Sequence, residues 1–323
     1  DVSLGRIACL LSDLTQQPLH GARRKVGEQF LELGLGAVMV LTVHIIPHTH
    51  TDPGWLQTYD NYYSRSVRGI LNTVVGSLIE SPNRTFAWSE VCYFARWYAE
   101  TSARRRRDVR ALVTAGRLEF VGGGWVQHDE ALPTVGAALD NMAEGHEWLR
   151  KTFGIAPTVG WQLDTFGHTA ANAALMAQMG LDALVINRIH FQLKRQWRTA
   201  RHLEFMWKAS GDAHVRGAPL LTHVLHTHYS CPRGFDFESS GFRPADLAVK
   251  AAELRKLVLT ERVRAYRTPQ LMLLVGDDFR WGKAGVLYRD WEQLIARARV
   301  GSPTIDFRLS TPSRYFAGGL CSL

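Results

Sequence analysis

Short apolar runs alternate with amphipathic helical stripes along most of this sequence. Residues 38–46 and 271–275 are apolar runs of strand length, whereas 67–79 and 286–295 repeat apolar residues every three or four positions. Strands separated by helices are typical of a parallel sheet. The sequence therefore predicts one α/β domain over residues 37–323, with a parallel sheet or barrel of roughly seven strands surrounded by helices. Residues 1–36 are predicted to be an N-terminal extension without an assigned role.

Polar side chains recur directly after the predicted strands. They are His50 and Asp52, the segment 128–130, Asp164, Arg188, and the pair Asp277 and Asp278. The carboxyl ends of parallel strands meet at one edge of the sheet, where ligand sites of α/β folds form. We therefore expect these side chains to meet on one active-site face.

His50 and Asp52 are the first candidates for a metal site. They lie two residues apart, so in extended backbone they project to the same side. A neutral imidazole and a carboxylate suit a zinc-type ion. Taken alone, this pair is more typical of an exposed turn than of a metal site, because Pro53 and Gly54 follow it.

Two further carboxylate positions suggest acid–base chemistry. Asp164 follows an apolar strand, where a carboxylate can be a metal ligand, a nucleophile or a cap. Asp277 and Asp278 are adjacent, and burial of two like charges together raises one pKa, as a general acid requires. A plain strand-to-helix turn is the alternative for this pair. Together with aromatic residues near the same positions, the carboxylates suggest glycoside hydrolysis.

Composition excludes some other classes. The net charge is +8, and part of it lies in the run Arg104 to Arg107, which is most simply a solvated helix face. Since no second basic cluster accompanies it, we expect no nucleic-acid partner. Four cysteines lie far apart, which argues against a cysteine metal cage but permits up to two disulfides. No segment reaches the length of a membrane span, and the first residues are unlike a signal peptide.

Several motifs together resemble the class II α-mannosidases of glycoside hydrolase family 38. The matching stretches occur in the family's order between residues 40 and 318: 48–55 (HTHTDPGW), 86–98 (FAWSEVCYFARWY), 122–133 (GGGWVQHDEALP), 160–169 (GWQLDTFGHT) and 276–280 (GDDFR). The resemblance implies a retaining exo-α-mannosidase with one zinc ion at the sugar site.

The resemblance assigns roles to single residues. His50, Asp52 and Asp164 match zinc ligands, and Asp164 is also the nucleophile. Asp278 matches the general acid/base. The positions that match substrate contacts are Trp55, Arg188, Asp277 and Tyr229.

The sequence departs from the family pattern at three points. Thr165 stands where proline usually follows the nucleophile. The segment 227–232, which carries Tyr229, aligns only loosely with the family's aromatic contact. The family's last zinc ligand is a histidine from a later helical domain, beyond the range of this chain. We therefore expect a downstream domain as partner, and weak zinc binding and little turnover without it. If the chain were active alone, His128, His168 and His228 would be the candidates for that ligand.

The subtype and the alternatives remain open at this point. The motifs most resemble the Golgi enzymes that process N-glycans, so the resemblance implies a mannose-containing glycan as substrate and the lumen of the secretory pathway, with the lysosomal branch as alternative. Two other function classes are an inactive carbohydrate-binding remnant and another metal-dependent hydrolase, such as a polysaccharide deacetylase. The oligomeric state is not predicted.

Overall fold

The computed structural model describes residues 40–209 and 219–319. The chain divides into two compact units, residues 1–38 and 39–323, and all described residues belong to the second. The expected N-terminal extension (1–36), Cys9 and Cys321 lie outside the described residues. Cys92 and Cys231 are both free thiols.

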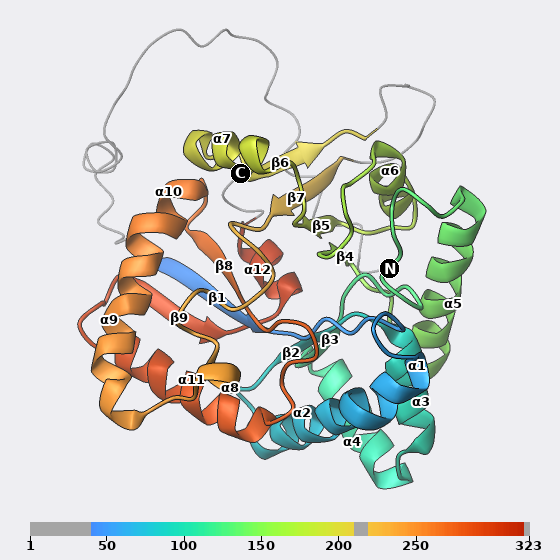
Figure 1. Ribbon diagram of the computed structural model, residues 1–323, viewed down its shortest axis with the longest axis horizontal. Helices are drawn as coiled ribbons and strands as arrows, with labels where there is room; N and C mark the ends of the chain where they lie inside the picture. Colours follow the sequence, from blue (N-terminus) through green and yellow to red (C-terminus); the bar gives the residue numbers. More distant parts are fainter. Residues whose placement is uncertain (1–39, 210–218, 320–323) are drawn as a thin grey trace, which may run out of the picture. The chain divides into compact units, whose positions relative to one another are not determined.

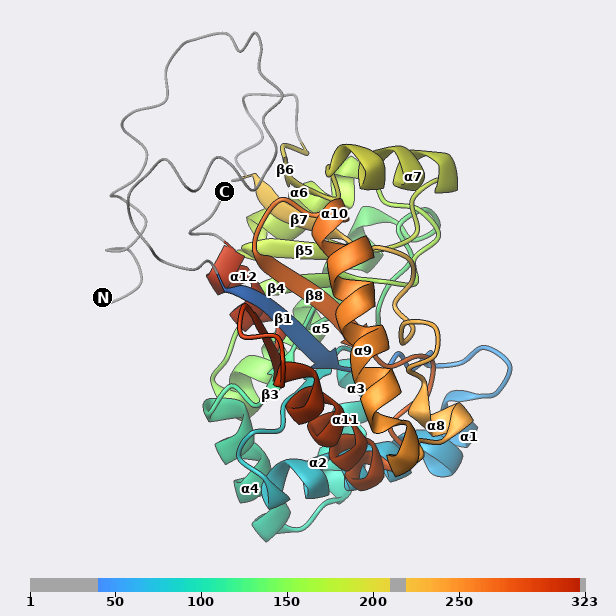
Figure 2. The same ribbon diagram turned by 90° about the vertical axis from the view of Figure 1, so that its left-hand side faces the viewer.

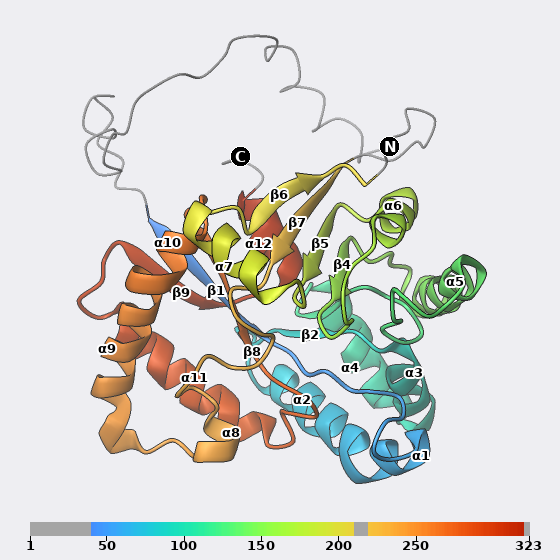
Figure 3. The same cartoon turned by 45° about the horizontal axis from the view of Figure 1, so that its top comes forward.

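Nine β-strands within the described residues form three hydrogen-bonded sheets, ordered β8-β1-β9, β2-β3 and β4-β5-β7-β6. The strands are β1 (Leu41–Pro47), β2 (Phe86–Trp88), β3 (Leu118–Phe120), β4 (Val159–Gln162), β5 (Ala183–Ile186), β6 (Glu204–Trp207), β7 (Leu220–Val224), β8 (Gln270–Val275) and β9 (Ile305–Leu309). Figure 3 shows the three sheets around a common interior, with helices outside them.

The prediction of an α/β fold with parallel strands is confirmed. All strand pairs within these sheets are parallel except β6 with β7. Single backbone contacts link one sheet to the next: His48 bridges to Ala87, and the Gly122 amide donates to the Val159 carbonyl at 2.8 Å. The expected sheet is thus divided into three, because the short strands β2 and β3 bond regularly only to each other.

Helices follow most of the strands and cover them (Figure 1). The α-helices are α1 (Tyr59–Tyr62), α2 (Arg68–Glu80), α3 (Val91–Glu100), α4 (Ala103–Thr114), α5 (Val135–Phe153), α6 (Ala170–Gln178), α7 (Phe191–Ala200), α8 (Phe237–Ser240), α9 (Leu247–Leu257), α10 (Val263–Ala265), α11 (Ala284–Arg299) and α12 (Pro312–Gly319). Three further helical turns adjoin them. η1 (Tyr63–Val67) and η3 (Val258–Arg262) are π-helical, and η2 (Pro244–Asp246) is a 3₁₀ turn. Among the described residues, no helix is both long and apolar enough to cross a membrane.

Strands β1, β2, β4, β5, β7 and β8 are buried along nearly their whole length, which explains their largely apolar sequences. In β5, Ala183 and Val185 pack in an inner cluster with Met272 and Phe316, while Leu184 and Ile186 face the outer core under the helices. This alternation follows from the two-residue period of a strand. Helix α12 contributes Tyr315 and Phe316 to the inner cluster, so the sheets enclose a packed core.

The arginine run 104–107 lies on α4, as the sequence predicted. Arg104 and Arg107 are more exposed than Arg105 and Arg106, and the Arg106 guanidinium lies over the Tyr98 ring at 5.6 Å. This part of the basic surface therefore also covers an aromatic side chain.

Candidate active site

The predicted site residues follow the carboxyl ends of different strands and come together there. His50 and Asp52 follow β1, Asp164 follows β4, and Arg188 follows β5. Tyr229 follows β7, and Asp277 and Asp278 follow β8. Parallel strands that begin on one side of the domain deliver their ends to the other; Figure 2 shows β1 and β8 running side by side in this way.

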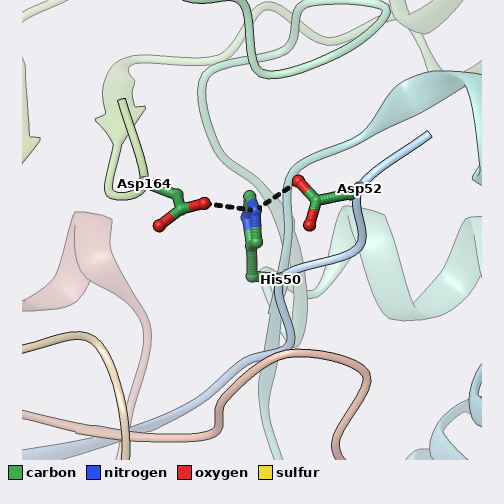
Figure 4. A group of neighbouring side chains, drawn as sticks. All are labelled: His50, Asp52 and Asp164. Carbon is green, nitrogen blue, oxygen red and sulfur yellow. Dashed lines mark hydrogen bonds and ion pairs between the residues drawn. The ribbon is translucent and has the colours of Figure 1, made fainter. Parts of the chain in front are cut away.

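One imidazole lies between two carboxylates at the centre of the site (Figure 4). The Nε2 atom of His50 is 3.0 Å from Oδ1 of Asp52 and 3.5 Å from Oδ2 of Asp164. One ligand atom from each residue lies within 4.8 Å of the others. In the described part of the chain, these three residues are the only such cluster of metal-type ligands.

The other nitrogen of His50 faces Glu90, a residue for which no role was predicted from the sequence. Its Nδ1 atom is 3.5 Å from Oε1 of Glu90, and both side chains are buried. The Thr51 hydroxyl donates to Oε2 of Glu90 at 2.9 Å. A carboxylate behind an imidazole fixes the orientation of the ring. Its position in the sequence could have indicated this role, since Glu90 follows strand β2 as Asp52 follows β1.

This arrangement fits a metal ion. With Nδ1 turned to Glu90, His50 presents Nε2 toward the two aspartates, and the set of one nitrogen and two carboxylate oxygens suits zinc. Without a metal, burial favours the neutral imidazole, but hydrogen bonds to Asp164, Asp52 and Glu90 outweigh it and raise the His50 pKa well above its usual value. Three carboxylates thus attract a cation to this point.

Asp164 is held in its ionised form by two cationic neighbours. Its Oδ1 atom accepts hydrogen bonds from Arg188, with Nε at 2.9 Å. Burial alone would raise the pKa of Asp164, but the contacts with His50 and Arg188 lower it well below the usual range. The Gln127 side chain holds the backbone here, because its Oε1 accepts from the amides of Leu163 at 3.1 Å and Asp164 at 2.9 Å.

The Tyr229 hydroxyl links Asp164 to Asp278. It lies 3.0 Å from Oδ1 of Asp164 and 2.8 Å from Oδ1 of Asp278. The sum of these distances, 5.8 Å, is the upper limit on the separation of the two carboxylate oxygens. Tyr229 is only 2% exposed, and the Nε2 atom of His48 bonds its backbone carbonyl at 2.8 Å. Burial lowers the pKa of His48 to about 4, so the ring is neutral and donates this bond.

The two adjacent aspartates have different surroundings. Partial burial raises the pKa of Asp278, and the charges of Asp277 and Asp164 add to this rise, although Tyr229 and His50 oppose it. The Asp277 carboxylate accepts from the Asp278 amide at 3.0 Å, and its backbone carbonyl accepts from the His50 amide at 3.2 Å. Asp278 therefore faces Tyr229, while Asp277 shapes the turn.

Trp55 lies in the loop after β1 with 69% of its surface exposed, so its ring is open to contact with a ligand. The other two tryptophans near the motifs differ from it, because Trp161 is buried in the inner core and Trp125 packs against the outer one.

The three alternative histidines are outside the ligand cluster. His128 bonds Asn172 at 2.9 Å, His168 bonds Glu130 at 3.0 Å, and His228 bonds Ser230 at 3.0 Å.

Comparison with known proteins decides the family. The sequence pattern described as "Glycosyl hydrolases family 38 N-terminal domain" matches residues 40–318. The chain belongs to glycoside hydrolase family 38. Lysosomal alpha-mannosidase of Bos taurus is 34% identical over 302 residues, which cover 85% of this chain and 30% of that protein. The chain spans only 23% to 32% of the length of the curated relatives it matches.

Solved structures that share the fold of this chain include an alpha-mannosidase and a putative polysaccharide deacetylase. An alpha-mannosidase from Enterococcus faecalis V583 has the same fold, with a TM-score of 0.66 and 20% identity over 87% of this chain and 29% of that chain. A putative polysaccharide deacetylase from Mycobacterium smegmatis superposes with a TM-score of 0.53 and 14% identity, covering 90% and 94%. At these identities the likeness concerns the fold alone, so the chemistry has to be argued from the site.

Proposed function

We propose that this domain provides the catalytic centre of a zinc-dependent α-mannosidase that removes terminal mannose with retention of configuration. The proposal rests on membership of family 38 and on the positions of two carboxylates, Asp164 and Asp278. Asp164 is the nucleophile that forms a covalent mannosyl-enzyme. Asp278 first protonates the leaving oxygen and then activates water.

The observation that carries the proposal is the bridging hydroxyl of Tyr229. Because both carboxylate oxygens bond the same hydroxyl, they lie at most 5.8 Å apart. Retaining glycosidases hold their two carboxyl groups about 5–5.5 Å apart, whereas inverting enzymes need about 6.5–9.5 Å to admit a water molecule. The short separation supports a double displacement through Asp164.

The same hydroxyl supports the division of roles between acid and nucleophile. A tyrosine hydroxyl has one proton and donates it to one carboxylate only. When Asp278 is protonated, its O–H donates to the Tyr229 oxygen and the Tyr229 hydroxyl donates to ionised Asp164; when Asp278 is ionised, the same hydroxyl can donate to Asp278 instead. The raised pKa of Asp278 and the lowered pKa of Asp164 agree with this pattern.

We propose zinc as the metal, held by His50, Asp52 and Asp164. When bound there, zinc supplies a Lewis acid for sugar hydroxyls next to the reacting carbon. Arg188 and His50 keep Asp164 ionised, and Glu90 keeps the His50 ring in place. Since zinc usually takes four ligands, we expect a further donor from a part of the full-length protein outside the described residues.

The substrate class follows from the same premise. We propose a mannose-terminated N-glycan, with Trp55 stacking on the sugar face and Arg188 and Asp277 lining the pocket. This places the protein in the lumen of the secretory pathway. The Golgi processing subtype remains our prediction, and a relative that is named lysosomal keeps the second subtype open.

The test is hydrolysis of p-nitrophenyl α-mannoside by the protein that contains this domain, followed by proton NMR. We expect the α-anomer of mannose as the first product, and loss of turnover on the order of 10⁴-fold or more for Asp164→Ala. A fluorinated mannosyl fluoride should label Asp164. Release of the β-anomer first, or labelling of another carboxylate, would contradict the mechanism. Sugar binding without any turnover would indicate an inactive carbohydrate-binding remnant. Release of acetate from an acetylated glycan would indicate a polysaccharide deacetylase.

A further inference from the structure

Three cationic side chains lie close together beside the segment 225–232, which carries Tyr229 into the active site. Arg262 ends the turn η3 and is only 5% exposed, and Lys194 and Arg198 lie one turn apart on α7. Among the described residues, none of the three has a carboxylate within ion-pairing distance. The nearest acidic neighbour of Arg262 in the sequence, Glu261, is exposed.

Two of these cations are bonded to the segment through its backbone. Lys194 Nζ donates to the Thr227 carbonyl at 2.8 Å and to Asn187 at 2.9 Å. Arg198 Nη2 donates to the His226 carbonyl at 2.7 Å. Neutral carbonyls satisfy hydrogen bonds but do not neutralise charge, so the cluster keeps a net positive charge.

Arg262 differs from the other two because it makes no hydrogen bond to the segment and two of its three guanidinium nitrogens are buried without a partner. Its Nε and Nη1 atoms are inaccessible and make no hydrogen bond in the structure. His226, 7% exposed, likewise leaves both ring nitrogens unbonded. Leaving a buried charge unpaired costs several kcal/mol in a protein interior, so a compensating group is expected beside it.

A small cavity lies where that group would sit. It is lined by Arg262, His226, Thr227, Ser230 and the apolar residues of β8. Its volume is about 10 Å³. No acidic side chain lines it. A space of this size holds one small particle, such as a water molecule or a monatomic ion, which leaves no room for phosphate or a carboxylate ligand.

His226 can donate a hydrogen bond to an anion although its ring is neutral. Burial, together with the charges of Arg262, Arg198 and Lys194, lowers the pKa of His226 to about 2, so the ring is neutral. One of its nitrogens then carries a hydrogen to donate. The cavity thus combines the guanidinium N–H groups of Arg262 with the imidazole N–H of His226, and the charges of Lys194 and Arg198 act on the same imidazole. A guanidinium is weakly hydrated, which favours a large monovalent anion over a strongly hydrated one.

We propose that the cavity between Arg262 and His226 binds one halide ion of the chloride class. The anion accepts hydrogen bonds from the Arg262 guanidinium and the His226 ring, and it offsets the charges of Lys194 and Arg198. The site lies outside the catalytic cluster. The bound ion stabilises the segment 225–232 because it keeps Arg262, Lys194 and Arg198 in place beside that segment.

Crystals of the protein soaked in sodium bromide test the site directly. We expect an anomalous peak for bromide in the cavity, within hydrogen-bonding distance of Arg262. A water molecule there with no bromide signal would overturn the proposal.

Thermal unfolding tests whether the ion binds at ordinary concentrations. At equal ionic strength, 100 mM chloride or bromide should raise the Tm by about 2–4 °C relative to gluconate. Arg262→Gln should lose this difference, while Arg264→Gln, which removes an exposed arginine two residues away, should keep it. Equal Tm in all salts would show binding at crystal concentration only and would refute the proposal. If Arg262→Gln fails to fold, the salt series on the unaltered protein still decides the question.

Discussion

The two sides of the active site are positioned by different kinds of interaction. On the side of β1 and β8, backbone pairing continues past the strands: the His50 amide bonds the Asp277 carbonyl, and the Phe279 amide bonds the His50 carbonyl at 2.9 Å. On the side of β4 and β7, side chains do most of this work, because Gln127 holds the backbone of Asp164 and His48 holds that of Tyr229, and one backbone bond joins the Cys231 amide to the Gly276 carbonyl.

This difference has a consequence for tolerance to substitution. A backbone ladder survives most side-chain changes and fails only where the chains can no longer approach each other. A side chain that holds a loop is lost by one substitution, and the cost appears as misplacement of the group it holds. The first side should therefore respond mainly in stability and the second mainly in turnover.

Among the substitutions that test this difference, the largest effect should come from Asp278, whose position depends on backbone pairing but whose chemistry depends on Tyr229. Asp278→Asn removes the proton donor, so we expect kcat to fall about 10²–10⁴-fold for mannosides with poor leaving groups and little for those with good ones. The pH profile gives a second measurement. An acid works below its pKa, so kcat/KM should fall as pH rises through the raised pKa of Asp278, and the variant should lack this limb. Equal losses for all leaving groups would remove Asp278 from the acid role.

The backbone-held side should break at Gly276. A Cβ atom there would lie 2.0 Å from the His48 carbonyl oxygen. Gly276→Ala therefore forces the two chains apart just past the ends of β1 and β8, where their backbone pairing continues. We expect a loss of about 2–4 kcal/mol in the free energy of unfolding, measured with urea. Gly69→Ala is the control, since nothing lies within 4 Å of that position. Similar stability for both variants would contradict the role of close backbone pairing.

The division into a backbone-held and a side-chain-held side also explains what the sequence could predict. Asp52, Asp164 and Asp278 follow apolar strands, and strand ends meet for topological reasons, so their convergence was predictable from pattern alone. Glu90 and Gln127 were missed because their roles depend on distances between loops from different strands. His48 belongs to the motif at 48–55, yet its role in holding Tyr229 depends on a contact across 181 positions. The division into three sheets was also beyond prediction, since it depends on where short strands stop pairing.

Glu90 allows a sharper test, because it is a side-chain support on the backbone-held side. Glu90→Gln should weaken the hold on the His50 ring and raise the Kd for zinc about 10–100-fold, measured by competition with a chelator. Glu119→Gln alters a half-buried glutamate that bonds Ser313 outside the ligand cluster, and it should leave zinc affinity unchanged. Unchanged affinity in Glu90→Gln would mean that the backbone ladder alone orients His50.

The smallest effect should come from Gln127, which touches neither metal nor sugar. Its Oε1 atom accepts from two consecutive amides, so Gln127→Ala leaves the Leu163 and Asp164 amides without partners and frees the turn that presents the nucleophile. Arg188 and Tyr229 still hold the Asp164 carboxylate, which limits the displacement. We therefore expect kcat to fall about 10-fold with little change in KM, because misalignment affects the reacting atoms more than binding. Gln192→Ala, at an exposed glutamine on α7, is the matched control. If Gln127→Ala lowered only the Tm and left kcat intact, the β4 side would be held as firmly by its backbone as the β1 side.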